Sequence, residues 1–229
     1  MTGPLTLALD ASTYTGTVAL LCGGAQLGAI DVPMRSVGRE TLLPAVADLV
    51  RQSGRAADDI ERIVCGSGPG SFTGLRIAAS IAKACAMRTG ARGEIPFYGV
   101  SSLLLIVAGN TIAREPGRYV AVLDALRGDV YAAAFEVGDD LSIVEVEAMS
   151  VRPRDSVDPV ATRLGARVVG PDQAIRFAPH ARGVARIQSL FRTAPVADLA
   201  TWEPEYGRTA AAQQRWEETH GRPLGGAQG

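Results

Sequence analysis

Short apolar runs that end in turn residues alternate with helical stripes along most of the chain. The pattern predicts a three-strand meander over 5–9, 17–22 and 25–32, and the same plan over 119–123, 130–137 and 141–148. In both meanders an aspartate closes the first strand: Asp10 in one and Asp124 in the other. Coincidence among short strands is the alternative, but the recurrence favours a chain built from two similar α/β halves.

Helical periodicity follows each meander. Segment 39–52 carries apolar residues every three or four positions and is followed by Gly54, a helix stop signal. Segment 75–88 is apolar on nearly every side, so it must be covered on more than one side. The remaining expected elements are helices over 101–110, 157–164, 172–177 and 209–219, strands over 97–100 and 166–169, and a flexible tail over 221–229.

The most specific motif is Ser67-Gly-Pro-Gly-Ser-Phe-Thr-Gly-Leu-Arg76, between an apolar run and the start of a helix. Its glycines let backbone N–H groups converge on an anion or on a neighbouring backbone. It is not a Walker loop, because Leu75 and Arg76 follow Gly74, and Ser71 lacks the flanking glycines of a nucleophile elbow. Both interpretations stay open. The residues of the possible anion or nucleotide loop are Asp10, Gly68, Gly70, Ser71, Thr73, Gly74 and Asp124.

Composition narrows the classes of protein. The chain has 229 residues, 47% of them hydrophobic and 21% charged, which is typical of a globular protein. A net charge of −1 and 5% aromatic residues argue against autonomous nucleic-acid binding. Three dispersed cysteines favour reduced thiols over a disulfide framework. We see no signal peptide and no apolar run long enough to span a membrane, so we expect a cytoplasmic protein.

Candidate chemistry is sparse. His180 and His220 stand alone, without the spacing of a metal site or the context of a catalytic triad, so we predict no catalytic and no metal-binding residue. Asp10 and Asp124 could hold a metal-bound nucleotide or could simply cap turns. Side chains rather than glycine follow both aspartates, at 11–13 and 125–127, where phosphate would have to enter. The sequence therefore favours turn-capping aspartates.

Four blocks, in order and over about the whole chain, resemble the bacterial TsaB (YeaZ) family. They are the opening LALDAST, the Gly68-Pro-Gly-Ser-Phe-Thr-Gly-Leu-Arg76 block, the turn Leu123-Asp-Ala-Leu-Arg-Gly-Asp-Val-Tyr131 and the closing Pro204-Glu-Tyr-Gly-Arg208. The resemblance implies an α/β fold of the duplicated actin-like, Hsp70-like and sugar-kinase (ASKHA, RNase H-like) type, with two mixed sheets flanked by helices. It implies a first half over 1–106, completed by a C-terminal helix over 205–220, and a second half over 107–204.

The same resemblance implies a non-catalytic paralogue of TsaD. Such a protein scaffolds and activates the TsaD threonylcarbamoyltransferase, together with the ATPase TsaE, in making threonylcarbamoyladenosine (t6A) in tRNA. It implies no cofactor of its own, ATP and a metal in the partner subunits, tRNA contact through the complex, and a homodimer when the chain is alone. The implied partner-facing residues are Leu42, Leu43, Val46, Leu49, Leu75, Ala78, Ala79, Ile81, Ala82 and Cys85.

One departure separates the chain from the catalytic paralogue. TsaD resembles this chain but carries a His-x-x-x-His metal motif, whereas the chain has no histidine before His180. Two other functions remain as alternatives. One is a kinase or ATPase of the same fold that uses Asp10 and Asp124, and the weaker one is a peptidase, for which no nucleophile–base pair is found.

Overall fold

The computed structural model describes residues 3–34, 40–87, 94–109 and 115–207, and its first half is built on a mixed five-stranded sheet. The strands follow the order β3-β2-β1-β4-β5. Antiparallel hairpins join the first three strands, while β4 and β5 are parallel to β1. The strands are β1 (Leu5–Asp10), β2 (Thr15–Cys22), β3 (Ala25–Pro33), β4 (Arg62–Gly68) and β5 (Phe97–Ser101).

The second sheet repeats this plan, in the order β8-β7-β6-β9-β10. Its hairpins are again antiparallel, and its last two strands are again parallel to the first. The strands are β6 (Gly117–Asp124), β7 (Asp129–Val137), β8 (Ile143–Pro153), β9 (Ala166–Gly170) and β10 (Ile175–Arg176). The match of order and direction confirms the expected fold class and places Asp10 and Asp124 at equivalent strand ends.

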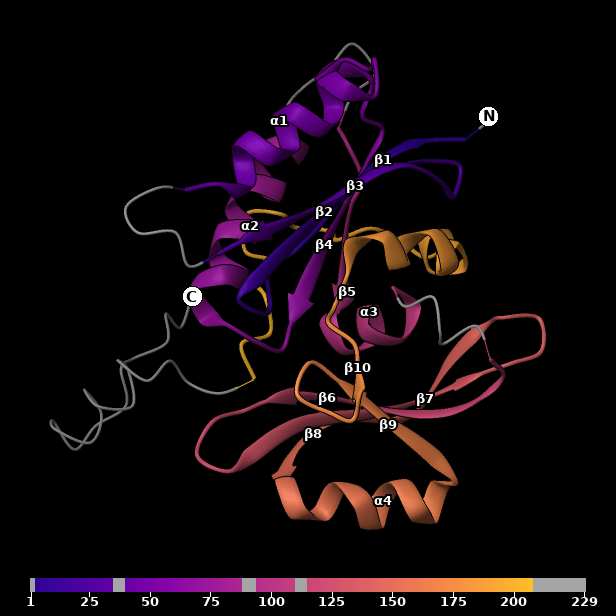
Figure 1. Cartoon of the computed structure of the whole chain (residues 1–229). Coiled ribbons are helices and arrows are strands. Elements are labelled where there is room, and N and C mark those ends of the chain that lie inside the picture. The colour runs from indigo at the N-terminus through magenta and orange to yellow at the C-terminus, as the bar shows by residue number, and fades with distance from the viewer. Residues whose placement is uncertain (1–2, 35–39, 88–93, 110–114, 208–229) are drawn as a thin grey trace, which may run out of the picture.

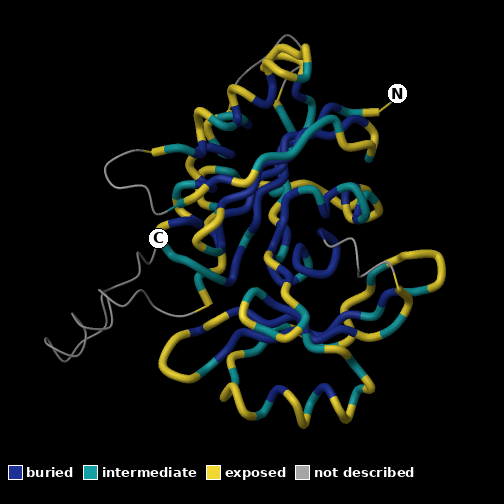
Figure 2. The backbone as a smooth tube through the Cα atoms, in the orientation of Figure 1, coloured by how far each residue is buried: buried dark blue, intermediate teal, exposed yellow. Residues whose placement is uncertain are grey.

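Helices cover the sheets in layers (Figure 1). α1 (Leu42–Gln52) and α2 (Phe72–Ala86) lie on the outer face of the first sheet, and α4 (Val157–Leu164) covers the outer face of the second. α3 (Ser102–Ala108) lies between the two sheets and is buried along most of its length (Figure 2). The short 3-10 helices are η1 (Ala57–Asp59), η2 (Arg154–Ser156), η3 (Ala181–Arg186) and η4 (Gln188–Arg192).

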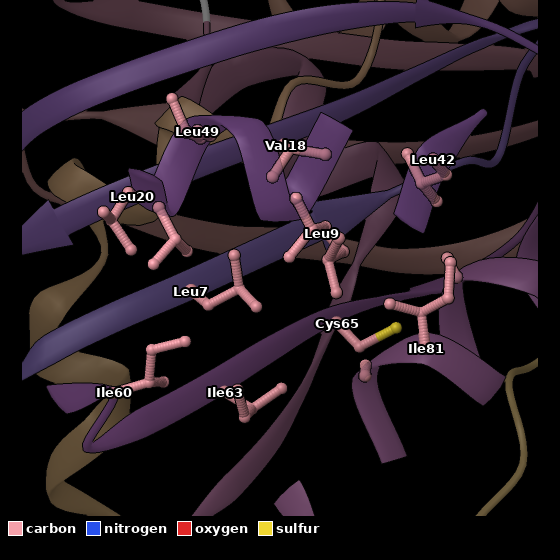
Figure 3. Packing of buried hydrophobic residues seen from close by; sticks show 14 of the residues in the cluster. Leu7, Leu9, Val18, Leu20, Leu42, Leu49, Ile60, Ile63, Cys65 and Ile81 are labelled. Atoms are coloured by element: carbon pink, nitrogen blue, oxygen red, sulfur yellow. The ribbon is translucent and has the colours of Figure 1, made fainter. Parts of the chain in front are cut away.

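Alternation along each strand divides the core into layers. In β1, Leu7 and Leu9 face α1 and α2, while Ala8 faces the opposite cluster that contains residues of η3. Strands covered on both faces read as continuous apolar runs, which is why the strands of the first sheet stood out in the sequence. Figure 3 shows the first of these layers, where side chains from β1, β2 and β4 meet those of the two outer helices.

Several element predictions need correction. Helix α2 begins three residues earlier than expected, because Ser71 caps it and Gly74 is helical. Residues 172–177 form a turn and the short strand β10 rather than a helix, since a strand here pairs in parallel with β9. The expected helix over 209–219 and tail over 221–229 lie outside the described residues.

The segment after β10 returns to the first sheet. Ala181, Val184 and Ile187 pack against Ala8 and Leu21, although we assigned residues 107–204 to the second half. The three residues are spaced three apart, two of them in η3 and Ile187 directly after it, and they lie in a stretch without clear helical periodicity. The exact division of the chain into domains stays a prediction. Among the described residues, no helix is long and apolar enough to cross a membrane.

Candidate functional site

A cleft of about 420 Å³ lies where the two sheets meet. Its walls come from both halves, because the turns after β1 and β6 and the start of α2 border it. The carboxyl ends of strands in α/β folds are where ligands commonly bind. The cleft is lined by residues 12–14, 70–73, 123–127, 131, 171–172 and 206.

Asp10 lies beside this cleft but does not line it. The residue is fully buried, and its Oδ1 atom accepts hydrogen bonds from the backbone N–H of Ser12 at 3.0 Å and the Ser12 hydroxyl at 2.7 Å. Its Oδ2 atom accepts one from the Ser102 hydroxyl at 2.6 Å. Burial raises the pKa of the Asp10 carboxyl, and the hydrogen bonds from Ser102 and Ser12 oppose that rise. Both oxygens are therefore engaged within the chain.

The glycine-rich loop packs against this aspartate turn. A Cβ atom on Gly70 would lie 2.3 Å from the carbonyl oxygen of Ser12, and one on Gly74 would lie 2.0 Å from that of Ala11. The N–H of Ser71 donates to the same Ser12 oxygen at 2.7 Å, and the Ser71 hydroxyl accepts from the N–H of Gly74. These glycines are needed for close backbone contact, which favours the packing interpretation of the loop.

Of the remaining predicted loop residues, Gly68 packs against neighbouring backbone and Thr73 is exposed. A Cβ atom on Gly68 would lie 2.3 Å from the carbonyl oxygen of Glu205, so the closing segment seals this side. Thr73 is exposed and lines the cleft from the first turn of α2. The structure therefore brings Gly70, Ser71 and Thr73 to the cleft and leaves Gly68 and Gly74 under neighbouring backbone.

Asp124 has a different environment from its counterpart Asp10. It is exposed at the cleft, where its Oδ1 atom lies 2.9 Å from Nη2 of Arg154. The turn that follows carries positive φ angles at two residues other than glycine, Leu126 at 63° and Arg127 at 57°. Backbone of this kind is strained and is commonly found at functional sites. The equivalent ends of the two repeats have thus diverged, one buried and one open.

Tyr206 closes one side of the cleft and bridges the two halves. Its ring lies 4.5 Å from that of Phe72 in α2, measured between ring centroids. Its backbone carbonyl accepts a hydrogen bond from the hydroxyl of Tyr131 in β7 at 3.3 Å. The closing block that includes Tyr206 was recognised in the sequence, but its contacts were not foreseen, because they join segments far apart in the chain.

Most of the predicted partner-facing residues lie in the interior of this chain. Leu42, Leu49 and Ile81 point into the core layer drawn in Figure 3. Leu43 is half exposed, at 51%, and Cys85 is partly buried. The other eight are buried within the chain itself; these are Leu42, Val46, Leu49, Leu75, Ala78, Ala79, Ile81 and Ala82. An interface on these helices would have to use the exposed side chains between them.

The remaining candidate groups are held in place by local contacts. His180 is buried, with Nε2 3.2 Å from Asp31 Oδ1 and Nδ1 accepting from the N–H of Arg182. The pKa of the Cys65 thiol is raised by burial and by Asp10. No group of three metal-ligating side chains gathers within the described ranges. His220 lies outside them.

Comparison with known families gives a match over more than half of the chain. The model of the family TsaD, tRNA N6-adenosine threonylcarbamoyltransferase, matches residues 38–176. The tRNA threonylcarbamoyladenosine biosynthesis protein TsaB of Escherichia coli is 36% identical over 130 residues, 57% of this chain and about half, 54%, of that protein. The TsaB protein of Bacillus subtilis is 26% identical over 93% of this chain and 98% of its own length.

A solved structure supports the fold. The crystal structure of a Pseudomonas aeruginosa protein described as similar to peptidase YeaZ superposes with a TM-score of 0.71 and 25% sequence identity. The superposition covers 90% of this chain and all of that one. The likeness therefore extends over nearly the whole chain.

Proposed function

Because the chain belongs to the TsaD-related family and, within it, to the TsaB (YeaZ) group, we propose that it is a non-catalytic subunit of the machinery that makes threonylcarbamoyladenosine in tRNA. A TsaD-like subunit would carry out the transfer, and a TsaE-like ATPase would assist it. ATP and the metal belong to those subunits in this proposal, and tRNA meets this chain only within the complex, in the cytoplasm.

The environment of Asp10 is the observation that supports a non-catalytic role. A carboxylate that holds a metal-bound nucleotide needs at least one oxygen open to the ligand. Ser12 and Ser102 occupy both oxygens of Asp10, and the residue is fully buried. The backbone carbonyls of Ala11 and Ser12 fill the space beside Gly74 and Gly70. These contacts support a role in which Asp10 and the glycine loop hold the chain together.

The outer face of α1 and α2 is the proposed docking surface for the TsaD-like subunit. The two helices lie side by side on the first sheet (Figure 1). Leu43 of α1 and Met87, directly after α2, are 51% and 69% exposed, with exposed Arg76 and Ala84 on α2. Large apolar side chains at the surface commonly mark protein interfaces.

A reconstituted reaction tests the proposal. A TsaD-like subunit and a TsaE-like ATPase would be assayed for threonylcarbamoyladenosine formation in tRNA, with and without this chain. We expect little product without the chain, full activity with the wild type, and full activity with Asp10→Asn. Product formed equally well without the chain, or lost with Asp10→Asn, would contradict the proposal.

An ATPase or kinase is the second candidate, and the open half of the cleft is the observation that favours it. Asp124 and Asp172 both line the space and are exposed. ATP turnover by the isolated chain, abolished by Asp124→Asn, would support this alternative. We expect no turnover, because Asp124 is paired with Arg154 and the Asp10 side is closed.

A further inference from the structure

The turn between β7 and β8 and the start of β8 carry a group of exposed apolar side chains. Within the described residues, nine large hydrophobic side chains are exposed, and three of them lie in the stretch 141–146. They are Leu141, Val144 and Val146, which are 38–59% exposed. Large apolar side chains that gather at the surface commonly mark a protein interface. We call residues 138–146 the hairpin tip, because they join β7 to β8.

The hairpin tip lies far from the surfaces described above. Val137, which precedes the tip, pairs with Gly117 at the beginning of β6, whereas Asp124 lies at the other end of that strand and lines the cleft. The eight residues of β6 separate the two ends by roughly 25 Å. In Figure 1 the tip projects at the right, away from α1 and α2. A partner bound at the tip therefore leaves the cleft and the outer helices free.

The hairpin tip also includes the beginning of an edge strand. β8 pairs with β7 on one side, and no strand of the described part of the chain lies on its other side. An edge strand presents backbone N–H and C=O groups that can pair with an added strand. The pairing of β8 with β7 is regular over 143–145 and then shifts, with Val146 as an extra residue. An added strand would therefore be short.

The turn of the hairpin tip holds one apolar side chain in a strained position. Leu141 has φ of 63°, a left-handed conformation that leucine rarely adopts. Its N–H donates to the carbonyl of Gly138 at 2.9 Å, and the N–H of Gly138 donates to the carbonyl of Ser142 at 3.0 Å. The Leu141 side chain remains 38% exposed, so packing within the chain does not explain why leucine occupies this position. Such backbone strain is commonly found at functional sites.

Exposed carboxylates accompany these apolar side chains. Asp139, Asp140 and Glu145 are all exposed, and no basic side chain among the described residues forms an ion pair with them. The nearby Glu147, by contrast, is paired with Arg163 of α4. A partner that carries lysine or arginine would gain favourable charge pairs at the tip. The phosphates of a nucleic acid would be repelled by the same carboxylates.

We propose that the hairpin tip binds a short extended segment of a different protein, in which apolar residues alternate with lysine or arginine. Successive side chains of a strand point to opposite faces of its sheet. Glu145 pairs with Phe135 and lies on the face toward α3, so Val144 lies on the face that carries α4. An apolar side chain of the segment would lie beside Val144, and a basic one beside Glu145. This proposal does not depend on the function proposed above.

A second copy of this chain does not fit the same surface. An antiparallel pair centred between Val144 and Val146 would place Glu145 of one copy opposite Glu145 of the other. A parallel pair in register would do the same. Like charges directly opposite each other on neighbouring strands are destabilising. The occupant must therefore carry the opposite charge.

Two synthetic peptides of about ten residues test the proposal, one alternating valine with lysine and the other alternating valine with glutamate. In fluorescence anisotropy with the full-length chain, we expect saturable binding of the lysine peptide and no binding of the glutamate peptide. Raising the ionic strength from about 0.1 M to about 1 M should weaken the binding, because salt screens exposed charges. Failure of the lysine peptide to bind, or equal binding of both peptides, would overturn the proposal.

Variants of the chain locate the binding site. Val144→Asp and Glu145→Lys should each weaken binding of the lysine peptide about tenfold or more, because an apolar contact or an ion pair is lost. Their unfolding curves should match the wild type, since both side chains are exposed. Leu190→Asp is the matched control, because it changes an exposed apolar side chain on η4 and should leave the affinity unchanged. Equal effects of all three substitutions, or none of the first two, would contradict a site at the hairpin tip.

Photo-cross-linking identifies the natural occupant. A photoreactive phenylalanine analogue replaces Val144 in the full-length chain inside its host cells, and mass spectrometry reads the sequence joined to it. We expect a segment of another protein that alternates apolar and basic residues, absent when the analogue replaces Leu190. No adduct, an adduct only with this chain itself, or a segment without basic residues would overturn the proposal.

Discussion

The hydroxyl of Ser102 donates to the carboxyl of Asp10 across 2.6 Å, and this contact joins the end of β1 to the start of α3. α3 lies between the two sheets, so the hydrogen bond ties the first sheet to the layer shared by both halves. In a nucleotide-handling protein a carboxylate at this strand end would face the ligand. Here it organises the chain itself.

Replacing Asp10 should separate its structural role from a catalytic one. Asp10→Ala leaves the N–H and hydroxyl of Ser12 and the hydroxyl of Ser102 without their acceptor in a buried place. We expect the free energy of unfolding to fall by about 3 kcal/mol. Chemical denaturation followed by circular dichroism measures this loss, and an unchanged midpoint would contradict it.

Asp10→Asn is the matched control and should be tolerated. Because burial raises the pKa of Asp10 above 3.8, its neutral form stabilises the fold fully below that pH, and the contribution is lost as the pH rises through the folded-state pKa. The amide is neutral at every pH, so the variant should equal or exceed the wild type in stability at neutral pH. A loss as large as that of Asp10→Ala would show that the ionised carboxylate is required.

Gly70→Ala should be costly, because the backbone beside it is occupied. The residue has φ of +154°, and a Cβ atom would lie 2.3 Å from the carbonyl oxygen of Ser12. We expect a loss of about 3 kcal/mol or more, from backbone strain and steric overlap together. Gly165→Ala is the control, since φ there is +60° but nothing lies within 4 Å, and strain alone costs about 1–2 kcal/mol. If thermal unfolding shows equal losses of stability in the two variants, the loop around Gly70 must shift to accommodate the added methyl group.

The two faces of the outer helices should respond differently to charge. Ile81→Glu puts an unpaired carboxylate into the core layer of Figure 3, so we expect a loss of several kcal/mol in the free energy of unfolding. Leu43→Glu changes an exposed side chain and should alter stability by less than about 0.5 kcal/mol. If α1 contacts a TsaD-like subunit, Leu43→Glu should weaken that binding in calorimetry. Unchanged affinity would exclude Leu43 from the interface.

The sequence predicted the elements that depend on residues close together in the chain. Turn residues between apolar runs predicted both meanders, and the repeated aspartates predicted the duplication that the sheet orders confirm. Helical periodicity located α1 and α4, because amphipathic helices repeat their apolar positions at a fixed spacing. The sequence could not decide whether the Gly68 block binds an anion or packs against neighbouring backbone. That choice depends on contacts with Ala11 and Ser12, which follow β1 and lie far from the block in the sequence.

Long-range contacts explain the remaining differences. Periodicity shows that Ile81 or Leu42 lies on an apolar face, but it cannot tell a core from an interface when both are apolar. Ser102 was not singled out, because an isolated serine carries no pattern, and it matters only through Asp10. Residues 181–192 lack clear periodicity. Their position is set by packing against the first sheet, with which they share a core layer.

His180 should make stability depend on pH. Burial, followed by the nearby positive charge of Arg182, lowers the pKa of His180, while Asp31 acts in the opposite direction. In the unfolded chain the group titrates near 6.5, so the unfolded state binds the proton more readily as the pH falls below that value. Protonation would also place a proton on Nδ1, which accepts from the N–H of Arg182 at 3.1 Å.

We therefore expect the free energy of unfolding to fall as the pH drops from about 6.5 toward 5, by at most about 1.4 kcal/mol per pH unit for one proton. Urea titrations at a series of pH values measure this slope. His180→Gln should flatten it, because glutamine does not titrate, while His220→Gln controls for the other histidine. A slope that survives His180→Gln but disappears with His220→Gln would assign the effect to the C-terminal segment. Such a result would mean that protonation of His180 is compensated by Asp31, whose Oδ1 lies 3.2 Å from its Nε2.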